Sequence, residues 1–248
     1  ADTNPAPPLE WRPVAAGSAT LGKKPGSGFG WDNEFDEHTM EVPAFAAQRF
    51  KVTNGDYLDF VEAGAPPPHF WRQHEGCWQY QGMFGSVALP LDWPVYVTHA
   101  EAAAYATWRG LRLPSEAEWH RMAYGTPTGG QRAWPWGEAA AQSQYGNFGS
   151  KNWDPSAVTA HASGASAWGI EDLIGNGWEW TSTPFAPLPG FRPFDFYPGY
   201  SANFFDGKHF VMKGGSARTA ACLLRRSFRN WFQTNYPYVY AGFRCIAD

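Results

Sequence analysis

Seven histidines and three cysteines are the side chains of this 248-residue chain that could bind a transition metal or supply a nucleophile. The histidines are His38, His69, His74, His99, His120, His161 and His209. No two of them are four residues apart, the spacing that places two metal ligands on one face of a helix. Cys77, Cys222 and Cys245 are too few and too scattered for a zinc site or a disulfide framework. We therefore expect buried thiols in a reducing compartment, and no metal site from histidine spacing.

The charge and hydropathy of the chain exclude two classes of protein. Nineteen basic and 23 acidic residues give a net charge of −4 without a basic stripe, so a nucleic-acid partner is not expected. No run reaches the roughly 18 apolar residues that a membrane-spanning helix needs, so no membrane partner is expected either. The start, ADTNPAPPLEW, lacks a basic segment followed by an apolar one, which favours a cytoplasmic protein without a signal peptide.

The composition predicts a protein rich in loops. The 27 Gly and 21 Pro make about 19% of the chain, against a usual total near 12%. The 14 Trp and the other aromatic residues can pin these loops, because each buried ring removes roughly 150–250 Å² from water. Such anchoring is most needed in residues 134–207, which apart from aromatic residues are mostly Gly, Pro, Asn and Ser. The rings expected to anchor this stretch are Trp136, Phe148, Trp153, Trp168, Trp178, Trp180, Phe185, Phe191, Phe194 and Phe196.

Three segments carry the start and stop signals of helices, over 53–64, 98–110 and 115–125. Each begins with a hydroxyl residue followed three positions later by a carboxylate, and each closes at a glycine. The pairs are Thr53 with Asp56, Thr98 with Glu101, and Ser115 with Glu118. This spacing predicts a capping box, in which the two side chains satisfy free N–H groups of the first turn.

Strand candidates lie at 11–21, 39–50, 208–215 and 240–246. Regular periodicity is weak elsewhere, and the chain has no internal repeat or linker. We therefore predict one α+β domain over 1–248 with little regular secondary structure.

The order of six motifs resembles that of the sulfatase-modifying-factor superfamily, whose founding member is the formylglycine-generating enzyme. The motifs are LEWRPVAAGSATLG, FKVTNGDYLDFV, WPVYVTHAEAAAYATWRGLRLPSEAEWHRMAYG, GIEDLIGNGWEWTSTPF, VMKGGSARTA and AGFRC. The resemblance covers Leu9 to Asp248 and implies a formylglycine-generating-enzyme-like fold related to the C-type lectins.

The copper chemistry of the founding enzyme is not expected here. In that enzyme, two cysteines follow the serine of the GGS motif by three and eight positions and bind copper. Counted from Ser216, these positions hold Thr219 and Leu224, and Cys222 matches neither. Cu(I) prefers thiolates, which neither residue supplies.

Four runs look like the sulfoxide synthases of ergothioneine and ovothiol biosynthesis. They are WDNEFDEHTMEVPAF, PLDWPVYVTHAEA, FYPGYSANFFDGKHFVMKGGS and RRSFRNWFQTNYPYVYAGFR. These non-haem iron enzymes use O2 to join a cysteine thiol to an imidazole carbon of histidine or trimethylhistidine. Their iron-binding histidines lie in an N-terminal DinB-like helical bundle, which has no counterpart in this sequence. The resemblance therefore implies Fe(II) from a domain or partner outside this chain.

The resemblance also implies a structural calcium ion at DLIGNGWEW. Its ligands would be the side chains of Asp172 and Glu179 and the backbone carbonyls of Gly175 and Gly177. Hard oxygen ligands suit calcium, and two carboxylates balance its charge. An alternative left open by the residues is that Asp172 and Glu179 cap turns or pair with arginines.

The substrate pocket implied by the resemblance is lined by the run that ends in Arg229, Asn230, Trp231 and Phe232. The Asn230 amide would bind a substrate carboxylate, and Trp231 would provide an apolar and cation–π wall. Phe232 and Tyr236 stand where relatives that use γ-glutamylcysteine have an acidic residue and an arginine, which favours free cysteine. The alternative is that this run is a buried strand, with Asn230 satisfying backbone groups.

A tyrosine of the FYPGYS run reaches the iron–oxygen site in some synthases and donates a proton. A phenol with a pKa near 10 can serve this purpose. Tyr200 is the first candidate and Tyr197 the second. The alternative is that the tyrosine has a structural role in a turn, where its hydroxyl makes a hydrogen bond.

The leading hypothesis is the substrate-binding and catalytic domain of a cysteine-using thiohistidine sulfoxide synthase. The alternatives are a non-catalytic lectin-like binding module and another oxidase of the superfamily.

Overall fold

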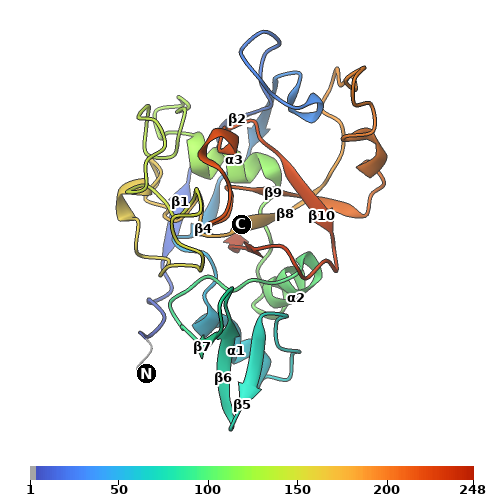
Figure 1. Ribbon diagram of the computed structural model, residues 1–248. Coiled ribbons are helices and arrows are strands. Elements are labelled where there is room, and N and C mark those ends of the chain that lie inside the picture. Colours follow the sequence, from blue (N-terminus) through green and yellow to red (C-terminus); the bar gives the residue numbers. More distant parts are fainter. Residues whose placement is uncertain (1–3) are drawn as a thin grey trace.

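The computed structural model describes residues 4–248, and its three α-helices are those that the sequence predicts (Figure 1). They are α1 (Asn54–Glu62), α2 (His99–Trp108) and α3 (Glu116–Tyr124). All three capping boxes are present, since each N-cap hydroxyl accepts the N–H of the third helical residue and the carboxylate of that residue accepts the N-cap N–H. The prediction of helix type and position is confirmed.

The strands form four small sheets (Figure 1). The first contains β1 (Trp11–Val14), β4 (Phe45–Gln48) and β12 (Ile246–Ala247), and the second pairs β2 (Gly17–Leu21) with β3 (His38–Val42). A third sheet, at the foot of Figure 1, is the meander of β5 (Trp71–His74), β6 (Cys77–Gln81) and β7 (Ser86–Ala88). The fourth has the order β10 (Asn230–Gln233), β9 (His209–Lys213), β8 (Trp178–Pro184) and β11 (Ala241–Gly242). Helices and strands are thus mixed in an α+β fold, as predicted.

The strand predictions are confirmed in part. The segments 11–21 and 39–50 each split into two strands, and 240–246 contains only the two-residue β11 and the first residue of β12. The prediction of an irregular stretch over 134–207 is wrong for β8. Its first four residues, WEWT, alternate apolar and polar side chains, but this run is too short to stand out among the surrounding Gly, Pro and Ser. All four are buried, because β8 lies between β9 and β11.

Two apolar clusters fill the interior. One surrounds α1 and α2, where the rings of Tyr57 and Tyr105 stack with centroids 5.4 Å apart. The other lies beneath α3 and includes the fully buried Trp119. Of the rings expected to anchor 134–207, Trp153 and Phe196 are exposed, and that part of the prediction is wrong.

The cysteines differ from expectation in their exposure. Cys77 and Cys222 are exposed free thiols, so the prediction that they are buried is wrong. Cys245 is buried, and burial raises the pKa of its thiol to about 12. None of the helices within residues 4–248 is long and apolar enough to cross a bilayer.

A long segment between β8 and β9 forms one side of the candidate site. Its two ends are joined by a hydrogen bond from the Phe185 N–H to the His209 carbonyl, at 2.7 Å. In Figure 1 this segment is the orange loop that extends beyond β9 and β10. At its far end the Ser201 hydroxyl accepts a hydrogen bond from the Asn33 amide and donates one to the Asp32 carboxylate.

Candidate functional site

A cavity of about 440 Å³ opens between the edge strand β10 and the segment that precedes β9. Its lining residues are Tyr200, Phe204, His209, Asn230, Trp231, Phe232, Gln233 and Tyr236. Five of these are residues that the sequence and its resemblance predict for substrate binding or catalysis: Tyr200, Asn230, Trp231, Phe232 and Tyr236. The fold therefore brings together side chains from two runs that lie about 30 residues apart.

Trp231 is the most firmly held wall of the cavity. Its ring lies on the buried ring of Phe185, with centroids 4.1 Å apart and an interplanar angle of 5°. The Tyr200 ring meets it edge-on with centroids 5.5 Å apart, and the Phe204 ring is tilted against it at 5.6 Å. The packing fixes an aromatic face that suits a cation or an apolar group.

Asn230 presents hydrogen-bond donors. Its side-chain oxygen accepts a hydrogen bond from the backbone N–H of Trp231 at 2.9 Å, which fixes the orientation of the carboxamide. Within the described residues its amide nitrogen has no hydrogen-bond partner. Two N–H groups are therefore left for an acceptor such as a carboxylate.

Of the two tyrosines predicted as proton donors, Tyr200 lines the cavity and Tyr197 does not. The Tyr200 ring stacks on Trp31 at 4.2 Å, and burial, aided by the nearby Glu34 and Asp32, raises the pKa of its phenol to about 12. The phenol is therefore protonated at neutral pH. Tyr197 contacts the Tyr200 ring at 5.3 Å but is 51% exposed and outside the cavity lining.

His209 is a cavity residue that sequence reasoning missed. Its Nδ1 lies 2.9 Å from the Asp206 carboxylate, and the imidazole is buried. The same contact lowers the pKa of the Asp206 carboxyl. An aspartate three positions before a histidine at the start of a strand is the signal that could have revealed the pair.

The prediction that Arg229 contacts substrate is corrected by its burial. Its Nε and Nη2 each lie 3.0 Å from an oxygen of the buried Glu116 carboxylate, and its Nη1 donates to the Ala186 carbonyl at 3.0 Å. Since Glu116 starts α3, the arginine joins β10 to α3 and to the segment after β8. Arg229 positions the neighbouring Asn230 and does not face the cavity.

Phe232 and Tyr236 form a further part of the cavity wall. Their rings stack with centroids 4.6 Å apart. No carboxylate or guanidinium lines this cavity, so a ligand with an extra charged arm finds no ionic partner among these residues.

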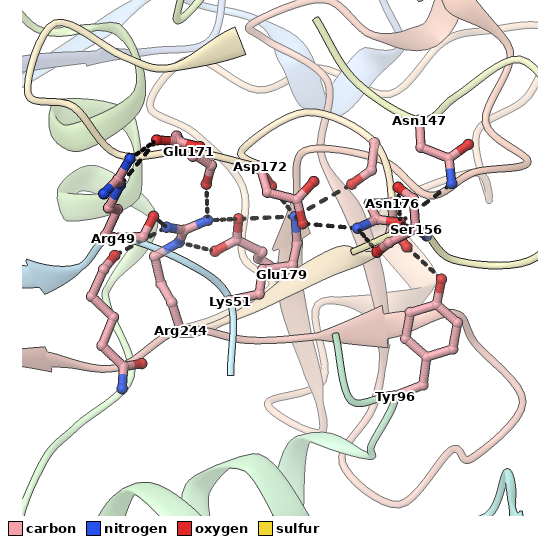
Figure 2. A network of polar contacts seen from close by, with 12 residues as sticks. Arg49, Lys51, Tyr96, Asn147, Ser156, Glu171, Asp172, Asn176, Glu179 and Arg244 are labelled. Carbon is pink, nitrogen blue, oxygen red and sulfur yellow. Dashed lines mark hydrogen bonds and ion pairs between the residues drawn. The ribbon is translucent and has the colours of Figure 1, made fainter. Parts of the chain in front are cut away.

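The predicted calcium ligands surround a lysine. Lys51 Nζ donates to the Asp172 carbonyl, lies 3.3 Å from the Asp172 carboxylate and from the Gly175 carbonyl, and is 3.6 Å from the Glu179 carboxylate. Figure 2 shows this ammonium between Glu179 and Asp172. The Gly177 carbonyl is not among its partners.

The backbone conformation of the loop places the oxygens of Asp172 and Gly175 around Lys51 Nζ. Asp172, Gly175 and Asn176 have left-handed conformations, with φ of 56°, 84° and 63°. A Cβ at Gly175 would lie 2.3 Å from the Asn147 carbonyl oxygen, so glycine is required there. The Asn176 amide donates to the Asp172 carboxylate at 3.0 Å, and burial raises the pKa of that carboxyl.

Arg244 completes the charge balance. Its guanidinium makes two hydrogen bonds to the Glu179 carboxylate, at 2.6 and 2.9 Å, on the side away from Asp172 (Figure 2). Two carboxylates thus meet two cations, and the residues present do not fit a further divalent ion. Lys51 thus occupies the loop of the expected calcium ligands Asp172, Gly175, Gly177 and Glu179, and the alternative of a pairing with arginine describes Glu179.

No other metal cluster takes its place. In the described part of the chain, no group of three or more His, Cys, Asp or Glu side chains is arranged to hold a metal ion.

Comparison with solved structures shows the fold. The structure of PvdO from Pseudomonas aeruginosa superposes with a TM-score of 0.69 at 20% identity, over 96% of this chain and 94% of that one. This confirms the predicted formylglycine-generating-enzyme-like fold related to the C-type lectins.

Comparison with known sequences identifies relatives. Hercynine oxygenase of Mycobacterium tuberculosis is 39% identical over 241 residues, which cover 88% of this chain and 56% of that protein. Ergothioneine biosynthesis protein 1 of Schizosaccharomyces pombe is 32% identical, over 89% of this chain and 28% of that protein. The chain thus spans about half the length of the mycobacterial relative and less of the yeast one.

The family model named sulfatase-modifying factor enzyme 1-like domain matches residues 6–248. The resemblance drawn from the six motifs is confirmed, and this chain belongs to that family.

Proposed function

We propose that this chain is the substrate-binding domain of an oxygenase of ergothioneine-type biosynthesis. The whole enzyme would join the sulfur of cysteine to an imidazole carbon of histidine or trimethylhistidine and leave a sulfoxide. The observation that carries the proposal is the convergence of Asn230, Trp231 and Tyr200 on one cavity. The names of the two relatives, which refer to hercynine oxygenation and ergothioneine biosynthesis, support it.

The cavity suits an amino acid with an imidazole side chain. Its volume of about 440 Å³ lies within the usual 300–1,000 Å³ of small-molecule sites. The free N–H groups of Asn230 would bind the substrate carboxylate, and the face of Trp231 would contact the α-ammonium or trimethylammonium group. With no carboxylate in the lining, recognition of that cation depends on aromatic faces.

Tyr200 would supply the proton that the reaction needs. Its phenol is protonated at neutral pH and would lie beside a substrate bound against Trp231, because the two rings are in contact at 5.5 Å. Tyr197 would support the Tyr200 ring from outside the cavity.

Fe(II) would be held by a DinB-like helical bundle outside the described residues, and when bound it would activate O2. Exposed rings near the cavity offer a surface for such a domain. Phe29 is 63% exposed and contacts Trp31, which in turn stacks on Tyr200. Tyr238 is 62% exposed and contacts Tyr236 at the cavity.

Ligand binding by the chain tests the proposal without iron. Calorimetric titration with trimethylhistidine, histidine and cysteine measures the affinity of the cavity itself. Trp231→Leu should weaken binding of trimethylhistidine about 30-fold, the loss expected for a desolvated cation–π contact of about 2 kcal/mol. Trp153→Leu is the matched control, because Trp153 is an exposed tryptophan outside the cavity.

A second measurement separates catalysis from simple binding. The chain is incubated with Fe(II), cysteine and trimethylhistidine, with and without a bundle-bearing partner, while oxygen is followed. Oxygen uptake with a cysteine adduct supports the oxygenase. Saccharide or peptide binding without turnover in any pairing would favour the lectin-like binding module instead.

A further inference from the structure

Lys51 lies where a metal ion of the DLIGNGWEW loop would have to lie. Its side chain is fully buried, and its three N–H groups match three acceptors: the Asp172 carbonyl, the Asp172 carboxylate and the Gly175 carbonyl. The Glu179 carboxylate, at 3.6 Å, completes the shell. These acceptors belong to three of the four residues expected as calcium ligands.

An ion and this ammonium cannot occupy the site together. Calcium requires its oxygens at 2.3–2.6 Å, which would place it at the position of Nζ itself. The local charge also opposes an added ion, because Asp172 and Glu179 are already matched by Lys51 and Arg244. Two additional positive charges in this fully buried cluster would have no counter-ions, and an unpaired buried charge is strongly unfavourable.

Unlike a free ion, the Lys51 ammonium is covalently attached to another part of the chain. Lys51 lies between β4 and the N-cap residue Thr53 of α1, more than 120 residues away from the loop that it holds. Its covalent attachment therefore joins the N-terminal part of the fold to the loop that leads into β8. Arg49, two residues earlier, adds an ion pair with Glu171 at 2.5 Å (Figure 2).

We propose that the Lys51 ammonium is a built-in replacement for a divalent cation in this loop, so that the domain folds and is stable without calcium. The inference does not depend on the proposed function, since it concerns a site distinct from the cavity at β10.

The first test uses the unmodified chain. Elemental analysis after purification should find no stoichiometric calcium, and melting curves in EGTA and in millimolar calcium should coincide. Stoichiometric calcium, or a melting temperature that rises by several degrees with calcium, would overturn the proposal.

The second test removes the Lys51 ammonium from the loop. Lys51→Met keeps most of the side-chain volume but leaves Asp172 and Glu179 opposed by Arg244 alone. The variant should melt at a lower temperature in EGTA, and calcium at 100 times its Kd should raise that temperature by about 5–10 °C. Magnesium should restore less, because it sheds water reluctantly for carbonyl ligands.

The control is Lys51→Met combined with Asp172→Asn, which removes one charge of each sign. It should lose most of the calcium response while melting above the single variant in EGTA. If Lys51→Met is not recovered folded, refolding in calcium but not in EGTA supports the proposal. A single variant that folds and ignores calcium, or that refolds in neither condition, shows that these oxygens do not form a cation site and overturns it.

Discussion

The indole of Trp231 lies flat on the phenyl ring of Phe185, with centroids 4.1 Å apart, although the two residues belong to different parts of the chain. Phe185 is the first residue after β8, whereas Trp231 is on β10. The cavity wall therefore depends on a core residue that does not itself line the cavity.

Phe185→Ala should disturb stability and ligand binding together. Loss of a buried phenylalanine costs about 3–5 kcal/mol, and the Trp231 ring would lose the surface that orients it. Urea unfolding measures the first effect and calorimetry with trimethylhistidine the second. Phe196→Ala, which truncates an exposed ring in the same segment, should leave the unfolding free energy nearly unchanged. Equal effects of the two substitutions would contradict the structural role given to Phe185.

Glu116→Gln should destabilise the protein by about 3–5 kcal/mol, the usual cost of leaving one member of a buried ion pair without its partner. The carboxylate of Glu116 is matched by Arg229 and lies 3.7 Å from Lys213. Chemical denaturation is the measurement, and Glu62→Gln on the exposed surface of α1 is the control. A loss below 1 kcal/mol would show that the pair adds little to the attachment of β10.

Acidification should destabilise the fold through His99. Burial lowers the pKa of this imidazole to about 4, and its ring stacks on Phe210 at 3.9 Å. Between pH 6.5 and 4 the unfolded chain binds a proton that the folded chain does not, so stability falls as the pH drops through this range. From pH 7 to pH 5 the loss due to His99 is about 2 kcal/mol.

His99→Gln removes the imidazole that titrates. In this variant the difference in unfolding free energy between pH 7 and pH 5 should be smaller than in the unmodified chain. His74→Gln, a change of an exposed histidine, is the comparison and should preserve the difference. His120 is also buried with a pKa well below its usual value, so part of the acid sensitivity should persist in His99→Gln. Identical pH profiles for the two variants would exclude His99 as a source.

His209→Phe should weaken binding of trimethylhistidine, if the proposed function is correct, and Asp206→Asn should weaken it less. The imidazole lines the cavity, whereas Asp206 acts by orienting it through Nδ1. Calorimetric titration with trimethylhistidine measures both variants, and a larger loss of affinity for His209→Phe than for Asp206→Asn supports these roles. No effect of either substitution would remove the pair from the site.

The elements with a local signature could be predicted from the sequence, and those defined by distant partners could not. The hydroxyl and carboxylate of each capping box are three residues apart, so the three helices were found with their starts. The first residues of β8 are buried, and its type is set by its neighbours in the sheet.

The same distinction holds for the candidate sites. Asn230, Trp231 and Phe232 are consecutive, and the motif that contains them identified the cavity wall. The lysine in the predicted calcium loop was missed because it lies 121 residues from Asp172 in the sequence. Arg229 was misassigned because its partner Glu116 is on α3, and no local pattern shows that pairing.

The hydrogen bond between Phe185 and His209 closes the segment between β8 and β9 at its base. A loop whose two ends leave neighbouring strands side by side can be lengthened, shortened or exchanged without altering either strand. This segment supplies Tyr200 and Phe204 to the cavity, while Asn230 and Trp231 come from the sheet. Ligand preference in this family can therefore diversify by replacement of one loop, while the strand that holds the common part of the ligand stays constant.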